Sequence, residues 1–347
     1  MPNSLTPRYL GGLTFSTAHM NTLMRLGEHL GRERLYLAQQ PTELEHLRQA
    51  AIVASTVSSN RLEGIEVAPS RVAALLQRNA NPRDRNEQEV AGYRGVLDLI
   101  HESHEHMALS PSVMLQLHKL LYRYHPYEGG RFKPTDNTII EQTPEGHQRV
   151  RFRPTPAVAT PGAIDTLCRL HEQARVTHPD LITLPLLILD FLCVHPFADG
   201  NGRISRLLTL LELYKAGHRV GRYVSIEQVI ESTKQGYYDA LEASSQGWHE
   251  GAHDVLPWLT YFWGVLLAVY ADFESRVDEV TASHGNKADS VELVALSMDA
   301  PFTLSELAER LPHVSRATIN RRLGKLRDQG RLHLSGKGRG AKWTPVD

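Results

Sequence analysis

The chain has 347 residues, of which 41% are hydrophobic and 22% are charged, and its formal net charge is −1. This length predicts two or three domains, and the composition is that of a globular protein able to bury a core. The near-zero charge excludes an overall bias toward nucleic acid or acidic membranes. Cys168 and Cys193 lack C-x-x-C spacing, which argues against a disulfide framework and against a zinc site.

No targeting or membrane-spanning signal is expected. Residues Met1–His19 lack a basic segment followed by a continuous apolar run. The two most apolar stretches, Leu181–Phe197 and Trp258–Phe273, are each shorter than about 20 residues and are interrupted by polar groups. We therefore expect a cytoplasmic protein with no membrane partner.

Apolar residues recur at helical spacing through most of the chain, which predicts a mainly α fold. His101–His106 is rich in histidine and glutamate but follows no standard zinc spacing, so a solvated helix end is expected there. His118 lies on an apolar-periodic helix and is expected to be a packed histidine. The clearest helical segments are Leu44–Ser58, Glu87–His101, Ser112–Tyr124, Ala163–Arg175 and Leu184–Val194.

The helical pattern is interrupted between Gly129 and Pro161 by a stretch rich in Gly, Pro and Thr. Within it, Thr138–Ile140 and Arg149–Phe152 are β-prone and flank the turn sequence Thr143–Gly146. A β-hairpin set into a helical domain is therefore predicted.

The segment His195–Arg206 reads His-Pro-Phe-Ala-Asp-Gly-Asn-Gly-Arg-Ile-Ser-Arg and joins two apolar helices, the second running from Ile204 to Leu213. Pro196 and the glycines force a loop, and the second helix is expected to begin near Gly200 or Asn201. The free N–H groups of a helix start bind anions, and glycine lets a phosphate approach the backbone.

The side chains of this segment complete a set that handles phosphates. His195 can accept a proton from an attacking hydroxyl, and Asp199 is a hard oxygen ligand suited to Mg²⁺. Arg203 and Arg206 lie three residues apart on one helix and can bind phosphates by charge-assisted hydrogen bonds. The combination predicts phosphoryl or nucleotidyl transfer.

The C-terminal tail has a different character. Residues 301–347 carry ten basic residues against four acids, a net charge of +6. Thr303–Glu306 has the form of a capping box that opens a short helix, and Ser315 can cap a second helix whose apolar face holds Ile319, Leu323 and Leu326. Two short strands follow, 332–334 and 341–344, so a winged helix-turn-helix after a boundary near His284–Asn286 is predicted. DNA contacts are expected from Arg316, Asn320 and Arg321 on the second helix and from Lys337 and Arg339 on the wing.

The segment from His195 to Arg206 resembles the signature of the Fic (filamentation induced by cAMP) family, H-x-F-x-[D/E]-G-N-G-R-x-x-R, and matches it at every fixed position. The resemblance covers roughly Leu5 to Phe273 and implies a Fic-type helical core that transfers AMP from ATP to a Ser, Thr or Tyr hydroxyl of a target protein. It implies His195 as the base and Asp199 as the Mg²⁺ ligand. It further implies that the Gly200, Asn201 and Gly202 backbone and the Arg203 and Arg206 side chains bind phosphates.

The same resemblance extends to the predicted hairpin, which is similar to the family's flap, where a target segment docks by strand addition. Asn137, Thr138, Ile139 and Ile140 would then lie beside the active site. The sequence departs from common forms of the family, which have arginine near Lys133 and glycine near Ile140. Tyr237 and Tyr238 resemble the tyrosine pair that lines the nucleotide pocket, with a packed aromatic pair as the structural alternative.

Ser59–Gly64 fits the family's inhibitory pattern, [S/T]-x-x-x-E-[G/N]. Ser59 and Glu63 are four residues apart and face the same side of a helix, and Gly64 fits a helix C-terminal position. The resemblance implies that Glu63 pairs with Arg206 and occupies the guanidinium that the γ-phosphate of ATP needs. This is the arrangement of the class with an N-terminal inhibitory helix in the same chain.

We therefore predict three regions: a helical region at 1–100 with the inhibitory motif at 59–64, a catalytic core at 101–283 with the flap at 129–156 and the signature at 195–206, and a winged helix-turn-helix at 287–347. Two alternatives for function are a DNA-binding regulator that uses the core as a nucleotide sensor and a de-AMPylase in which Glu63 positions a water. The tail could also serve protein contacts, and a homodimer is expected.

Overall fold

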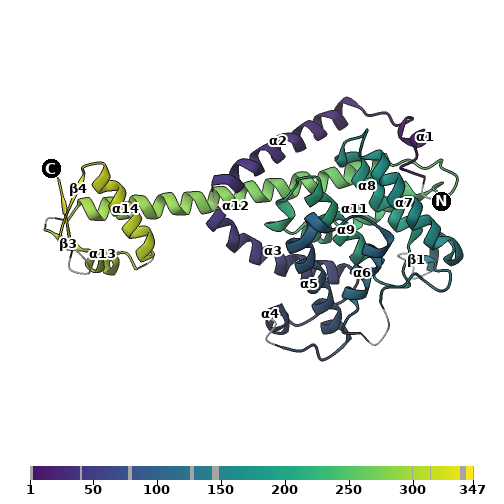
Figure 1. The fold of residues 1–347 in the computed structure, drawn as a ribbon, viewed down its shortest axis with the longest axis horizontal. Coiled ribbons are helices and arrows are strands. Elements are labelled where there is room, and N and C mark those ends of the chain that lie inside the picture. Colours follow the sequence, from purple (N-terminus) through teal and green to yellow (C-terminus); the bar gives the residue numbers. More distant parts are fainter. Residues whose placement is uncertain are drawn as a thin grey trace. The chain divides into compact units, whose positions relative to one another are not determined.

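The computed structural model describes residues 3–39, 41–76, 80–125, 129–142, 148–298, 300–312, 314–336 and 341–346. The chain divides into two compact units, Met1–Phe273 and Glu274–Asp347. Helices account for most of the described residues in both, so the predicted mainly α fold is confirmed (Figure 1).

The first unit consists of helices around two buried central helices, α8 and α9. Both carry buried residues on every face, as expected for helices at the centre of a core. Helix α8 packs against α7, α9 and α11, and α9 packs against α3, α5 and α6. The α-helices that lie wholly within this unit are α1 (Pro7–Leu10), α2 (Thr17–Gln39), α3 (Pro41–Leu62), α4 (Pro69–Leu76), α5 (Arg85–Ser103), α6 (Pro111–Leu121), α7 (Thr160–Ala174), α8 (Asp180–Val194), α9 (Asn201–Lys215), α10 (Ile226–Ser232) and α11 (Lys234–Ser245).

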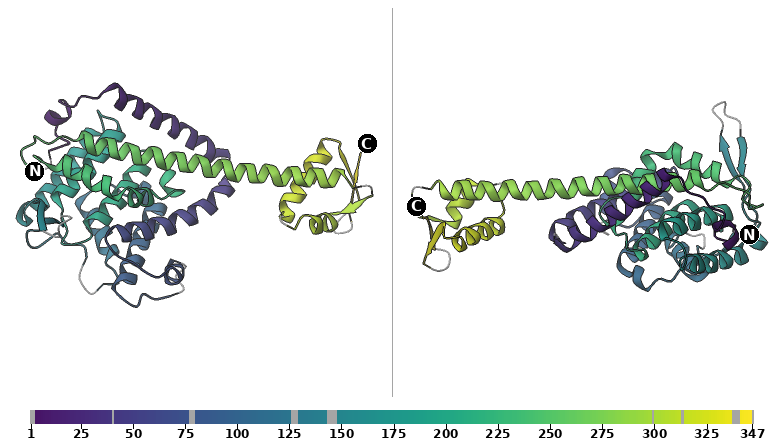
Figure 2. Two further views of the ribbon diagram at one scale, coloured as in Figure 1. Left: turned by 180° about the vertical axis from the view of Figure 1, so that it is seen from behind. Right: turned by 90° about the horizontal axis from the view of Figure 1, so that it is seen from above.

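The predicted hairpin is present as strands β1 (Ile139–Gln142) and β2 (Gln148–Phe152). They pair antiparallel, with Ile140 opposite Val150 and a register shift between Ile139 and Ile140. In the right-hand view of Figure 2 the two strands rise away from the helices of the first unit. The turn predicted at 143–146 lies outside the described residues.

The predicted division between residues 100 and 101 is wrong, because it falls inside helix α5 and inside a single compact unit. Helix α5 packs against α3, α4, α6 and α9, and its Tyr93, Val96 and Leu97 are fully buried. The N-terminal helices and the central helices therefore share one hydrophobic core, which no change of composition along the sequence reveals.

Helix α12 (Leu256–Leu296) extends past the predicted domain boundary. It continues without a break through 284–286, where the sequence predicts a domain boundary. The division between the two compact units falls instead between Phe273 and Glu274. A single glycine inside a helix costs only about 1 kcal/mol, so Gly285 does not end this one.

One segment of α12, Leu256–Asp278, is long and apolar enough to cross a membrane by length and composition alone. Half of its most apolar window is buried within the protein, including Trp263 and Phe273. Core helices with such burial pass the same test, so the segment is weak evidence for a membrane span.

The second unit contains the elements predicted for the tail. Thr303 caps α13 (Leu304–Arg310) in a reciprocal capping box with Glu306, and Ser315 caps α14 (Arg316–Asp328). Ile319, Leu323 and Leu326 are buried in a separate core with Phe302 and Trp343. The strands β3 (Phe302–Thr303), β4 (Leu332–Ser335) and β5 (Lys342–Pro345) form one antiparallel sheet in the order β3-β5-β4.

Buried histidines are a feature of the first unit. His101 and His104 are only 3% and 5% exposed, so the solvated helix end predicted at 101–106 is wrong for these two residues. They pack against Tyr214, an aromatic partner far away in the sequence. Burial lowers the pKa of six described histidines to about 3 or about 4, namely His101, His118, His171, His195, His218 and His253.

Acidification from pH 6.5 toward pH 4 is expected to lower the free energy of unfolding. The six histidines take up protons below about pH 6.5 when unfolded but stay neutral when folded, so the unfolded state binds more protons. Burial raises the pKa of Glu33 to about 8 and that of Asp190 to about 6. The folded state therefore binds up to two protons that the unfolded state lacks, and these offset two of the six histidine protons. The net excess of about four protons gives a slope of at most about 5 kcal/mol per pH unit.

Urea unfolding at several pH values between 5 and 7.5 measures this slope. Replacing the exposed His106 by Gln is the matched control and should leave the slope unchanged. A free energy of unfolding that stays constant between pH 6.5 and pH 5.5 would contradict the prediction.

Candidate active site

The signature segment forms the predicted loop between α8 and α9. Its two ends are left-handed: His195 ends α8 with φ 51°, and Gly200 precedes α9 with φ 81°. His195 is the one non-glycine residue with positive φ in the described part of the chain. Helix α9 begins at Asn201, as predicted, and its first N–H groups face the loop.

The Asn201 side chain closes this loop. Its Oδ1 accepts from the Phe197 N–H at 2.9 Å, and its Nδ2 donates to the Phe197 carbonyl at 2.8 Å. Asn201 is 2% exposed and Phe197 is fully buried. The side chain therefore holds the shape of the loop, whereas the sequence suggested a role only for the Asn201 backbone.

His195 is arranged as a neutral base. Its Nδ1 lies 3.3 Å from the Leu192 carbonyl, which can only accept, so Nδ1 carries the proton and Nε2 keeps a lone pair. Burial, aided by the positive charge of Lys133, lowers the pKa of His195 to about 4. The imidazole is consequently unprotonated at neutral pH and can accept a proton.

Asp199 carries an exposed carboxylate, with 59% of its side chain accessible. Its Oδ1 accepts from the Gly200 N–H at 2.7 Å, and its Oδ2 lies 3.4 Å from Arg85. Although partial burial acts to raise it, the pKa of Asp199 is lowered by the Arg203 charge and by the Gly200 N–H. No cluster of three or more metal-ligating side chains occurs among the residues described. Mg²⁺ often takes only one or two carboxylates together with substrate phosphates, so a lone exposed Asp199 fits such an ion.

The position of Arg203 differs from the prediction that its side chain is placed to bind phosphates. It is 1% exposed and lies outside the cavity, where its guanidinium pairs with Glu89 and donates to the Tyr122 hydroxyl at 2.8 Å. Glu89 lies 114 residues away in the sequence, so nothing in the signature itself indicates this partner. In this structure Arg203 joins α9 to α5 and α6 and offers no donor to the cavity.

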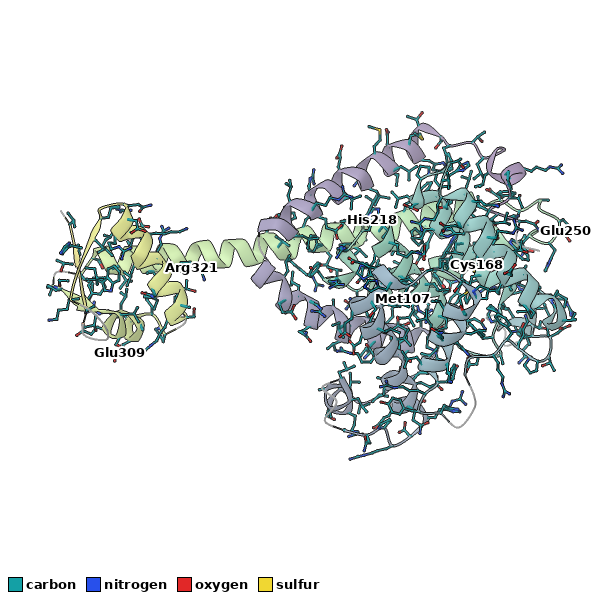
Figure 3. The ribbon with its side chains drawn as sticks, viewed as in Figure 1. Met107, Cys168, His218, Glu250, Glu309 and Arg321 are labelled. Carbon is teal, nitrogen blue, oxygen red and sulfur yellow. The ribbon has the colours of Figure 1, made fainter. Side chains whose placement is uncertain are left out.

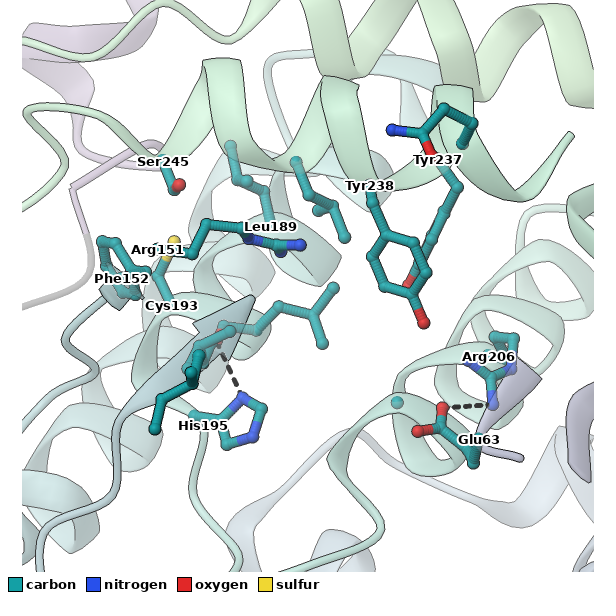
Figure 4. A pocket seen from close by; sticks show the side chains of 16 residues that line it. Glu63, Arg151, Phe152, Leu189, Cys193, His195, Arg206, Tyr237, Tyr238 and Ser245 are labelled. Atoms are coloured by element: carbon teal, nitrogen blue, oxygen red, sulfur yellow. Dashed lines mark hydrogen bonds and ion pairs between the residues drawn. The ribbon is translucent and has the colours of Figure 1, made fainter. Parts of the chain in front are cut away.

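Arg206 contacts the motif at 59–64 through Nε and Nη2. Its Nη2 lies 2.8 Å from Glu63 Oε1 (Figure 4). Its Nε donates to Ser59 Oγ at 2.8 Å, and its Nη2 also donates to the Ser59 carbonyl at 2.8 Å. Gly64 has φ 76° just after the end of α3, so its predicted C-terminal position is confirmed. The predicted contact between Glu63 and Arg206 is present.

Glu63 also lies against the backbone of the signature at Gly202. A Cβ at Gly202 would stand 2.2 Å from Glu63 Oε1 and 3.2 Å from Arg206 Nη1. Only a glycine at this position leaves room for the carboxylate. Glu63 thus fills the space beside the start of α9 that an anion would use.

A cavity of about 380 Å³ is lined by His195, Gly202, Arg206 and Glu63, whereas Asp199, Gly200, Asn201 and Arg203 are not among its lining residues. Figure 4 shows His195 on one side, Arg206 with Glu63 on another, and Tyr237 and Tyr238 above them. The two tyrosine rings lie 5.2 Å apart and both line the cavity, and Tyr237 also packs against Trp258 and Tyr261. Other lining residues are Ile139, Ile140, Arg151, Phe152, Leu189, Leu192, Cys193, Gln235, Leu241 and Ser245.

The four flap residues named from the sequence divide into two groups. Ile139 and Ile140 line the cavity, whereas Asn137 and Thr138 do not. Asn137 instead donates from Nδ2 to the Phe197 carbonyl at 3.2 Å, so it supports the signature loop from behind.

Sequence reasoning missed two kinds of functional side chain. Arg151 lines the cavity with its guanidinium carbon 5.4 Å from the Tyr238 ring centroid. His118, expected as a packed histidine, does stack on Phe197 at 3.9 Å. It also accepts from the Gly130 N–H and lies 3.1 Å from the Asp199 carbonyl, for which the sequence holds no local signal.

The predicted DNA-contacting residues are partly described. Arg316, Asn320 and Arg321 are exposed on α14, away from its buried face. Arg321 is labelled in Figure 3. Lys337 and Arg339 lie outside the described residues. Cys168, labelled in Figure 3, and Cys193 are both free and buried.

The chain is similar to known proteins in sequence. The family model described as Fic/DOC family matches residues 108–213. The chain is 23% identical over 237 residues to "Protein adenylyltransferase fic-1" of Caenorhabditis elegans, with 66% of this chain and 42% of that protein covered. It is 22% identical over 268 residues to "Protein adenylyltransferase Fic" of Aedes aegypti, with 69% and 50% covered. The chain thus spans half or less of the length of these curated relatives.

Solved structures share the fold. A Fic family protein from Desulfovibrio desulfuricans G20 superposes with a TM-score of 0.63 at 20% identity, covering 96% of this chain and 97% of that chain. Fic-1 from Caenorhabditis elegans superposes with a TM-score of 0.60 at 20% identity, covering 77% and 74%. At this identity the likeness shows the fold alone.

Replacing Asn201 by Ala is expected to destabilise the protein by about 1–3 kcal/mol, because the buried Phe197 N–H loses its acceptor. Urea unfolding at constant m-value measures the change. Asn21→Ala, at an exposed position of α2, is the control and should stay within about 0.5 kcal/mol of wild type. Equal effects of the two substitutions would show that the Asn201 side chain does not hold the loop.

Proposed function

Because this chain belongs to the Fic family, we propose that it is a protein adenylyltransferase, which transfers AMP from ATP to a hydroxyl of a target protein. The observation that carries the proposal is that a neutral His195, the Gly202 backbone and Arg206 line one cavity. A base and two phosphate-binding groups within one cavity are what nucleotidyl transfer requires.

In the proposed reaction His195 Nε2 accepts the proton of the target Ser, Thr or Tyr hydroxyl. The hydroxyl oxygen then bonds to the α-phosphorus of ATP, and the bond from that phosphorus to the bridging oxygen breaks, which releases pyrophosphate. The lowered pKa of His195 supports this role, because the base is free at neutral pH. A Mg²⁺ ion held by Asp199 would neutralise phosphate charge.

Nucleotide binding is assigned to the two ends of the cavity. Arg206 and the N–H groups at the start of α9 would bind the phosphates. Tyr237 and Tyr238 would contact the adenosine, since aromatic side chains offer flat apolar surface to a base. The target segment would dock along the hairpin, where Ile140 and Val150 are 54% and 48% exposed.

Glu63 is proposed to inhibit this reaction. Its carboxylate holds Arg206 and fills the space beside Gly202, so a phosphate would meet both a blocked guanidinium and a negative charge. Under this proposal the described cavity is in the inhibited state, in which Arg206 pairs with Glu63 instead of the γ-phosphate of ATP.

Glu63→Gly is expected to raise the rate of AMP transfer by on the order of tenfold or more, because it frees Arg206 for ATP. The measurement is intact mass after incubation with Mg²⁺ and ATP, alone and with a lysate of candidate targets, where one transferred AMP adds about 329 Da by the chemistry of covalent nucleotidylation. Glu63→Gly/His195→Ala is the control and should give no adduct.

The other outcomes separate the alternatives. Adducts of equal amount in wild type and Glu63→Gly would contradict the inhibitory role. Loss of AMP from a previously modified protein, dependent on Glu63, would identify a de-AMPylase. Absence of any transfer would leave nucleotide sensing as the role of the cavity.

A second activity is proposed for the C-terminal unit, namely contact with duplex DNA through α14. The supporting observation is that Arg316, Asn320 and Arg321 are all exposed on one helix while Ile319 and Leu323 fill the core. The order of helices and strands is that of a winged helix-turn-helix, whose second helix enters the major groove.

Binding of a labelled 30-base-pair duplex is expected to weaken steeply between about 50 and 200 mM salt, as phosphate contacts do. Arg316→Ala and Arg321→Ala should each weaken binding, and each should reduce the salt slope by about one if it contacts a phosphate. Arg25→Ala, at an exposed arginine of α2, is the control in fluorescence anisotropy with the full chain. Binding unaffected by the α14 variants would contradict this assignment and favour a protein-contact role.

A further inference from the structure

The segment 129–137, which precedes the hairpin, is bonded to the backbone on both sides of His195. The Lys133 N–H donates to the Pro196 carbonyl at 2.8 Å, and Lys133 Nζ donates to the Val194 carbonyl at 3.1 Å. Lys133 thus donates hydrogen bonds to the carbonyls of the residues before and after His195. Its side chain does not line the cavity, and the residue is only 4% exposed.

The bonding continues along the loop through neighbours of Lys133. Nζ donates to Asn137 Oδ1 at 2.8 Å, and Asn137 Nδ2 donates to the Phe197 carbonyl at 3.2 Å. The Gly130 N–H donates to His118 Nδ1 at 2.9 Å, which leaves the proton on Nε2, 3.1 Å from the Asp199 carbonyl. The segment therefore holds the carbonyls of Val194, Pro196 and Phe197 directly, and His118, which accepts from Gly130, lies against the carbonyl of Asp199.

His195 needs such support. A positive φ is rare and strained in a residue with a side chain, and it persists only when the surroundings over-determine it. Here φ is 51° and the two adjoining carbonyls are both fixed by Lys133. Releasing these carbonyls would let the backbone relax and turn the imidazole away from the cavity.

We propose that Lys133 is a positioning residue for the transfer reaction: it fixes the left-handed turn at His195 and thereby aims Nε2 at the target hydroxyl. This inference rests on the proposed function. It adds a coupling between the flap and the base, because the segment that carries Lys133 leads directly into β1.

Lys133 also acts on the imidazole by its charge. The charged groups that act on His195 come from three places, Lys133 from the pre-hairpin segment, Glu63 from the end of α3 and Asp199 from the loop. Burial lowers the pKa of Lys133 to about 8, so the ammonium is positive at neutral pH. Its charge helps to lower the pKa of His195, whereas the two carboxylates act in the opposite direction.

The test compares Lys133→Met, Lys133→Arg and Lys119→Met, each combined with Glu63→Gly. Methionine keeps the length of lysine without charge or donors, and arginine keeps both. Lys119 is exposed on α6 and serves as the matched control. Circular dichroism and thermal unfolding of each variant establish that it is folded.

Lys133→Met is expected to lower kcat by on the order of 10- to 100-fold, as misplacement of a base by about 1 Å does. KM for ATP should stay within about threefold, because Lys133 does not contact the cavity. The acid limb of the pH profile should move to higher pH, since the His195 pKa rises when the neighbouring charge is removed. Lys133→Arg should restore part of the rate, and Lys119→Met should match the parent.

A readout independent of catalysis distinguishes failure of this inference from failure of the proposed function. NMR titration of labelled histidine, with the His195 signal assigned from His195→Gln, gives the His195 pKa even if Glu63→Gly transfers nothing. A higher His195 pKa in Lys133→Met than in Lys119→Met supports the inference. An unchanged pKa, or an unchanged rate and pH profile, overturns it.

Discussion

The charge of Arg206 governs the architecture of the site. Its guanidinium is 3% exposed, and a buried cation is tolerated only when acceptors surround it. Ser59 and Glu63 supply those acceptors from the end of α3, more than 140 residues earlier in the chain. Satisfying this one charge therefore fixes where α3 meets α9 and so determines one wall of the cavity.

The opposite wall is set by a strained turn rather than by a charge. His195 adopts a left-handed conformation at the end of α8, and the loop after it is closed by Asn201 and by the segment around Lys133. Most of these bonds use backbone carbonyls as acceptors. The position of the imidazole consequently depends on main-chain geometry, which tolerates less displacement than a network of flexible side chains.

Local signals in the sequence were sufficient for local structure. The capping box at Thr303, the start of α9 at Asn201 and the hairpin strands follow from residue types within a few positions of one another. The spacing of Ser59 and Glu63 likewise predicted their common face. The site residues of the signature could be named because their order matches a known pattern, and three of the seven, His195, Gly202 and Arg206, line the cavity.

What the sequence could not reveal depends on partners that are distant along the chain. The sequence alone suggests that Arg203 binds phosphate, because its partners Glu89 and Tyr122 are distant along the chain. It likewise suggests that His101 is solvated, because the packing of Tyr214 against it has no local signal. Helix α12 continues through Gly285, where a domain boundary was expected, because helix propensity is a weak preference. The Ser59 contacts to Arg206 carry one more consequence. They do not involve Glu63, so two bonds from Ser59 hold the guanidinium independently of the carboxylate, and any anion that replaced Glu63 would meet a donor already in place.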